Sequence, residues 1–207
     1  MKKFILVICI LLSSLAMGID QRPEQIKIYE TEITNSKDRD ETAVILKEYE
    51  DYFKNYLVSI SSNESEVFYL GDQYFKERKY ERAGQIFSSN INSARNLFGA
   101  GTSYRIIGDY EKAIDFYSVA ISLDPTMQEA YFGRGLAYRD IGRYNKAIDD
   151  IQVYMNYTPK LEGYLALGDI YLAEKNINMA REILQDGRRK FPQSKEISTM
   201  LTSTYAR

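Results

Sequence analysis

The chain has 207 residues, of which 44% are hydrophobic and 27% are charged, a composition typical of a globular protein of about one domain. The formal net charge is −2, which argues against a nucleic-acid-binding surface, because such surfaces are basic. Histidine is absent and Cys9 is the single cysteine, which excludes a Ser-His pair, an imidazole base and a Cys/His zinc site. We therefore expect a protein that is not an enzyme and holds no cofactor or metal, with carboxylate or lysine chemistry as a minor alternative.

The first 18 residues are predicted to be a signal peptide. Two lysines precede the apolar run at residues 4–12, and the small residues Ala16 and Gly18 have the spacing of a signal-peptidase site. Cleavage near Ala16 or Gly18 predicts export to the periplasm or another extracytoplasmic location. Two alternatives stay open, an uncleaved membrane anchor and lipid attachment at Cys9, although the apolar run is shorter than the ~20 residues of a membrane span. Contact with the membrane is expected only in those two cases.

Two segments precede the repeated part of the chain. Residues 19–37 are mostly polar apart from a short Ile-Lys-Ile stretch, which predicts an extended or flexible tail. Residues 38–62 carry a broad apolar stripe at helical spacing, and Asp38 with Glu41 forms a capping box, so we expect an N-terminal helix. We expect this helix to pack on the first hairpin as an extra layer. The alternatives are that it occupies the groove formed by the repeats or that it engages a partner.

An internal repeat fills most of the remaining chain. Gly101-Thr102-Ser103-Tyr104 matches Gly135-Leu136-Ala137-Tyr138 at an offset of 34 residues, from 101 to 135, and the match continues through the whole unit. Apolar residues recur at i, i+3, i+4 and i+7 before and after a polar break, which predicts a hairpin of two helices. A glycine inside a helix costs about 1 kcal/mol relative to alanine, so the repeated glycine indicates a closely packed neighbouring helix. The recurrent residues of the four copies are Gly71, Gly101, Gly135 and Gly168; Tyr74, Tyr104, Tyr138 and Tyr171; and Ala83, Ala113, Ala147 and Ala180.

This pattern resembles the tetratricopeptide repeat, and the resemblance covers roughly residues 64 to 192. It implies an all-α fold, an α-α superhelix (solenoid) of four helical hairpins with an N-terminal helix and a C-terminal capping helix. The first copy is shorter than the others by about one helical turn. The expected boundaries are 63–193 for the solenoid, with repeats near 64–93, 94–127, 128–160 and 161–193, and 194–207 for the capping helix.

The same resemblance implies where a ligand binds, because this family uses one face of each first helix as a concave, ligand-lining surface. Phenylalanines at one repeat position are expected to form a ladder along it, and Arg105 and Arg139 to act as carboxylate hooks. The alternative is that the phenylalanines complete the core between adjacent hairpins. The candidate residues are Phe68, Asp72 and Phe75; Phe98, Thr102 and Arg105; Phe132, Leu136 and Arg139; and Leu165, Asp169 and Leu172.

Members of the family that bind acidic chaperone tails use Lys, Asn and Arg at defined groove positions, and this chain departs from that pattern at Phe68, Asp72 and Glu129. We therefore expect no carboxylate clamp for a chaperone tail, and predict an apolar or amphipathic segment of a protein partner as the ligand. The predicted function is an extracytoplasmic protein-protein interaction scaffold in cell-envelope assembly or maintenance. The alternative is a self-assembling structural module that forms homo-oligomers without an external peptide ligand. The acidic pair Asp149-Asp150 is predicted to lie on a solvated face.

Overall fold

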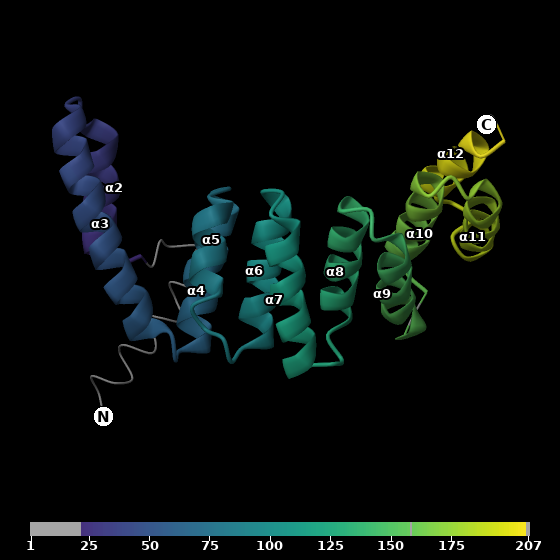
Figure 1. Ribbon diagram of the computed structural model, residues 1–207, viewed down its shortest axis with the longest axis horizontal. Helices are drawn as coiled ribbons and strands as arrows, with labels where there is room; N and C mark the ends of the chain where they lie inside the picture. Colours follow the sequence, from purple (N-terminus) through teal and green to yellow (C-terminus); the bar gives the residue numbers. More distant parts are fainter. Residues whose placement is uncertain (1–21, 158, 206–207) are drawn as a thin grey trace. The chain divides into compact units, whose positions relative to one another are not determined.

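A computed structural model describes residues 22–157 and 159–205, so the predicted signal peptide lies outside the described residues. The described part contains eleven helices, α2 to α12, and no strand. This confirms the predicted fold class, an all-α array of helical hairpins of the α-α superhelix (solenoid) type (Figure 1). None of these helices is both long and apolar enough to cross a membrane. The chain divides into two compact units, unit 1 up to Asn90 and unit 2 from Ile91, and each is described by itself.

Unit 2 contains three helical hairpins whose helices fall within the expected repeat boundaries. Each first helix packs on the second helix of its own hairpin, and the first helices α6, α8 and α10 also contact one another in order. The turns inside two hairpins are made by Gly108 at φ 85° and Gly142 at φ 73°, in the left-handed region that favours glycine. The helices are α6 (Ala94–Ile106), α7 (Tyr110–Leu123), α8 (Gln128–Asp140), α9 (Tyr144–Tyr157), α10 (Leu161–Ala173) and α11 (Ile177–Lys190).

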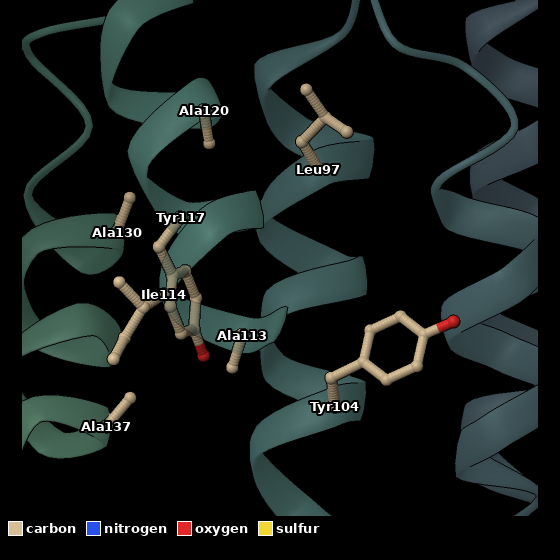
Figure 2. Close-up of a cluster of buried hydrophobic side chains, with 8 residues drawn as sticks. All are labelled: Leu97, Tyr104, Ala113, Ile114, Tyr117, Ala120, Ala130 and Ala137. Atoms are coloured by element: carbon tan, nitrogen blue, oxygen red, sulfur yellow. The ribbon is translucent and has the colours of Figure 1, made fainter. Parts of the chain in front are cut away.

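Aromatic rings in the core of unit 2 fill the space that glycines leave. Tyr117 of α7 is 1% exposed, and a Cβ added at Gly101 of α6 or Gly133 of α8 would lie 2.8 Å or 2.5 Å from its ring. Figure 2 shows Tyr117 within the cluster of buried residues that α6, α7 and α8 contribute. The recurrent glycine thus permits the close helix packing that its place inside a helix predicts.

The last hairpin of unit 2 is covered by α12 (Lys195–Ser203), which contacts α10 and α11. Ile197 and Leu201 of α12 are buried, as expected for a capping helix. The end of α12 is held by Arg181, whose Nη2 donates to the carbonyl oxygen of Thr204 at 2.7 Å. The predicted C-terminal cap is therefore present.

Unit 1 contains the first hairpin, formed by α4 (Glu64–Lys76) and α5 (Tyr80–Phe87). The predicted shortening falls in the second helix, because α5 has eight residues where α7 has 14. A Cβ added at Gly71 of α4 would lie 2.5 Å from the Phe87 ring, so this hairpin uses the same glycine-to-ring packing as unit 2.

The N-terminal helix of unit 1 is α3 (Arg39–Ile60), and it contacts α4 as an extra layer on the first hairpin would. Asp38 is its N-cap, and the side chain accepts hydrogen bonds from the backbone N–H groups of Asp40 and Glu41. The reciprocal half of the capping box is replaced, since the Glu41 carboxylate accepts from the Ser36 hydroxyl at 3.4 Å.

The prediction of an extended or flexible tail at residues 19–37 is wrong for most of that segment, because α2 spans Glu24–Asn35. Ile26 is fully buried, and the Tyr29 ring lies 6.1 Å from that of Tyr49 on α3, between ring centroids. Ile26, Tyr29 and Ile33 are spaced i, i+3 and i+7, so one apolar stripe packs α2 on α3 despite the polar composition. A helix this short depends on such tertiary contacts.

Candidate protein-binding surface

The candidate residues lie on the first helices of the hairpins. Nine of them lie on α6, α8 and α10 of unit 2, and Phe68, Asp72 and Phe75 lie on α4 of unit 1. All are half-buried, and those of unit 2 are brought together by the contacts of α6 with α8 and of α8 with α10. We refer to the nine residues of unit 2 as the first-helix surface: Phe98, Thr102, Arg105, Phe132, Leu136, Arg139, Leu165, Asp169 and Leu172.

The phenylalanines pack against rings of the second helix in their own hairpins. The centroid of Phe98 lies 5.8 Å from that of Tyr117, and the centroid of Phe132 lies 4.5 Å from that of Tyr154. In unit 1, Phe68 lies 6.0 Å from Phe87. Each ring therefore packs on the core of its hairpin and keeps part of its surface exposed, and its role in ligand binding stays a prediction.

The polar residues of α6 meet the buried hydroxyl of Tyr117. Tyr117 donates to Thr102 Oγ1 at 3.1 Å, and Thr102 Oγ1 donates to the carbonyl oxygen of Phe98 at 3.0 Å. Burial raises the pKa of Tyr117, while the Thr102 hydrogen bond, the Arg105 charge and a hydrogen bond with Arg105 lower it in part. Thr102 and Arg105 of the predicted site thus lie beside the Tyr117 hydroxyl, and Phe98 lies beside the Tyr117 ring.

The two predicted carboxylate hooks differ. Arg139 is held by carboxylates of the chain itself: Nε and Nη2 donate to Asp140 Oδ1 at 2.9 Å and 2.5 Å, and Nη1 donates to Asp169 Oδ2 at 2.9 Å. Asp72 in unit 1 is likewise paired, with Lys76 at 2.6 Å. Partners of opposite charge are therefore already in place for Arg139, Asp169 and Asp72. Arg105 is the arginine of the first-helix surface that has no carboxylate partner among the described residues.

The prediction that Asp149-Asp150 lies on a solvated face is wrong for Asp150, which is 6% exposed. Both of its carboxylate oxygens accept from Arg134, from Nε and from Nη2, each at 2.8 Å. Arg134 also donates to the Ser118 hydroxyl at 3.0 Å, so this pair joins α9, α8 and α7. Arg134 occupies the repeat position that Leu167 occupies in the next repeat. A charged residue at this otherwise apolar position was the sequence feature that could have indicated a buried ion pair.

Unit 1 carries a cleft of about 550 Å³ between α3 and α5 that the sequence did not predict. Phe53 and Leu57 of α3 and Arg82 of α5 line it, and Val58 at its edge is 69% exposed. The Arg82 guanidinium lies 4.4 Å from the centroid of the Phe53 ring and pairs with Glu50.

Comparisons with known proteins agree with this repeat architecture. A family model described as TPR repeat matches residues 101–142, and one described as tetratricopeptide repeat matches residues 161–187. No curated protein matches the chain.

Several solved structures are similar to the fold. MamA (residues 41 to the end) from Desulfovibrio magneticus RS-1 is 17% identical, with 70% of this chain and 84% of that chain covered and a TM-score of 0.63. A tetratricopeptide repeat protein from Parabacteroides merdae is 20% identical, with 79% and 71% covered and a TM-score of 0.62. A chain in the structure of the APC/C hetero-tetramer Cut9-Hcn1 is 19% identical, with 67% of this chain and 29% of that chain covered and a TM-score of 0.59. These identities show the fold alone, whereas the two family models show that the chain contains tetratricopeptide repeats at residues 101–142 and 161–187.

Proposed function

We propose that this protein is an interaction scaffold that binds an apolar or amphipathic segment of a partner protein along the first-helix surface. A tetratricopeptide solenoid is typically a non-enzymatic scaffold for protein-protein interaction. The observation that carries the proposal is that α6, α8 and α10, which contact one another in order, repeat a half-exposed apolar side chain at Phe98, Phe132 and Leu165. Rigid aromatic side chains give large contact areas at low entropic cost, which favours them as anchors.

Support for a peptide-like segment comes from the chemistry beside the apolar positions. Thr102, Arg105 and Leu136 lie on the same helices, so the surface alternates apolar and polar groups in the way an amphipathic segment requires. Among the similar structures, Cut9 is found in a hetero-tetramer with Hcn1, which is a protein complex. We infer a protein ligand of mixed character and no acidic chaperone tail.

We further propose that the scaffold is exported and acts in assembly or maintenance of the cell envelope. The support is the sequence of the first 18 residues, with two lysines, an apolar run and small residues at Ala16 and Gly18. Mass spectrometry of the protein purified from its native host tests this proposal. Export predicts a chain that starts at Met17 or Ile19, whereas an intact or lipid-modified N-terminus would contradict cleavage.

Site-specific photo-crosslinking tests the binding surface without unfolding it. p-Benzoylphenylalanine at Phe98 or Phe132 keeps an aromatic ring in place, and the same residue at Val119 of α7, 46% exposed, is the matched control. We expect adducts of one defined partner segment at Phe98 and Phe132, mapped by mass spectrometry, and none at Val119. Equal adducts at all three positions would contradict the first-helix surface as the binding site.

Self-assembly is the alternative, and a specific observation favours it. Val119 and Leu123, one helical turn apart on α7, are 46% and 47% exposed and offer an apolar contact away from the first helices. Self-assembly predicts that crosslinks join two copies of this chain at Val119. It also predicts a mass in light scattering that rises with concentration, whereas a constant monomer mass would exclude it.

A further inference from the structure

Two arginines of unit 2 occupy the same place in consecutive repeats but have different surroundings. Arg105 of α6 and Arg139 of α8 each follow the repeat tyrosine directly, at Tyr104 and Tyr138. Arg139 has all of its nitrogens bound by carboxylates of the chain, two of them by Asp140 and one by Asp169. The chain therefore shows, in one repeat, how a guanidinium at this position is satisfied.

At the two corresponding positions around Arg105, both carboxylates are replaced by apolar residues. Ile106 stands directly after Arg105, where Asp140 stands after Arg139. Leu136 of the following repeat stands where Asp169 stands in the repeat after Arg139. The Nε of Arg105 is buried and has no hydrogen-bond partner among residues 22–157 and 159–205. In Arg139 the same atom donates to Asp140 at 2.9 Å. A buried N–H group without an acceptor is unfavourable, and an acceptor that reaches it relieves the penalty.

The neighbours of Arg105 direct such an acceptor to the first-helix surface. Phe98, Thr102 and Arg105 are spaced i, i+4 and i+7, so they lie on one face of α6. The Arg105 side chain is half-buried, so part of it remains exposed on this face of α6. A guanidinium beside an apolar ring favours a ligand that combines an acidic group with an apolar one.

We propose that Arg105 binds a side-chain carboxylate, from Asp or Glu, of the partner segment, in the position that Asp140 occupies on Arg139. We commit to a side chain rather than a chain terminus because both carboxylates on Arg139 are aspartate side chains. This inference rests on the proposed function, since the rest of the segment lies along the first-helix surface. It adds that the partner carries an acidic residue next to the apolar residue that contacts Phe98.

The test follows the Nε–Hε signals of Arg105 and Arg139 by NMR in the full-length chain, assigned with Arg105→Gln and Arg139→Gln. The probes are N-acetyl-aspartate amide, its neutral counterpart N-acetyl-asparagine amide, and N-acetylglycine, which offers only a terminal carboxylate. We expect a saturable shift of the Arg105 signal with the aspartate probe and none with the asparagine probe. We expect Arg139 to stay unmoved, because its acceptors are already in place.

A matched pair of variants separates the site from general charge effects. Ile106→Asp supplies the missing carboxylate internally, so we expect the half-saturation concentration of the aspartate probe to rise about tenfold or more. Val119→Asp adds the same charge on α7 and should leave the response unchanged. The inference is overturned if Arg105 does not shift, if both arginines shift alike, if Ile106→Asp has no effect, or if N-acetylglycine binds more tightly than the aspartate probe.

The two proposals fail in different ways. Crosslinks at Phe98 and Phe132 with no selective response of Arg105 would leave the proposed function and remove this inference. A selective response of Arg105 with crosslinks distributed over all positions would remove the proposed binding surface, and with it the partner segment assigned to Arg105.

Discussion

Within each of the two units, the helices are held together by a different set of contacts. In unit 2 the hairpins pack through small residues and rings, as where Tyr117 fills the space beside Gly101 and Gly133. In unit 1 the added helix α2 is joined to the first hairpin by polar groups, because the Glu30 carboxylate accepts from Tyr74 of α4 at 2.9 Å, and Arg22, just before α2, pairs with Glu77 at the end of α4 at 3.1 Å. Packing that is repeated from hairpin to hairpin leaves a periodic pattern in the sequence. The polar network around Glu30 occurs once, so it leaves no such pattern.

Removing Asp150 gives the largest expected effect and tests whether unit 2 also depends on a polar contact. Asp150→Ala leaves the Arg134 guanidinium, 19% exposed, without its carboxylate, so we expect unfolding to become easier by about 3 kcal/mol. Asp149→Ala removes an exposed carboxylate from the neighbouring position and should change stability by less than about 0.5 kcal/mol. Denaturant titration measures both. Equal effects would mean that the pair adds nothing to the apolar packing of unit 2.

The repeats were predictable because their spacing states which residues face the core. The helix pairs and the shortened first hairpin follow from glycine, tyrosine and alanine positions that recur along the chain, and the C-terminal cap follows from the helical spacing of Ile197, Leu201 and Tyr205. α2 was missed because its apolar residues Ile26, Tyr29 and Ile33 stand among polar residues and have no second copy to reveal them.

The candidate site was predictable in place but not in chemistry. Repeat register put Arg105 and Arg139 at equivalent positions, and the structure has them on the corresponding helices α6 and α8. Their difference depends on partners, and Asp169 reaches Arg139 from another hairpin. Contacts between side chains so far apart in sequence cannot be read from one sequence, because nothing in the spacing reports which oxygen faces which nitrogen.

The second prediction concerns the glycine packing that characterises unit 2. Gly133→Ala places a methyl group 2.5 Å from the Tyr117 ring, so we expect a loss of about 2 kcal/mol in unfolding free energy. Adding Tyr117→Leu to this variant removes the ring that the methyl meets. The double variant should therefore lose less than the sum of the two single losses in the same titration. Additive losses would show that Gly133 matters for a reason other than Tyr117.

The third prediction concerns the polar network of unit 1. Tyr74→Phe removes the hydroxyl that donates to Glu30, so we expect a loss of about 1 kcal/mol and faster amide exchange in α2. Tyr69→Phe, at a tyrosine that is 40% exposed, is the control and should change neither quantity. Unchanged exchange in α2 after Tyr74→Phe would mean that the stripe at Ile26 alone attaches this helix.

The smallest expected effect separates charge from packing at the cleft of unit 1. The Arg82 hydrogen bond holds the pKa of Glu50 below its ordinary value of 4.5, partly opposed by burial. A carboxyl whose pKa is lowered by folding stabilises the folded state above the unfolded pKa and loses that contribution as pH falls through the folded pKa.

Wild type should therefore exceed Glu50→Gln in stability near pH 6 by less than about 1 kcal/mol, because the Glu50 side chain is 52% exposed. The difference should shrink as the pH falls through the folded pKa of Glu50, because the wild-type carboxyl then becomes protonated and neutral, like the glutamine side chain. Thermal unfolding of both proteins across this range measures it. A difference that stays constant as the pH falls would assign the role of Glu50 to positioning the Arg82 guanidinium over the Phe53 ring, a contact that does not titrate.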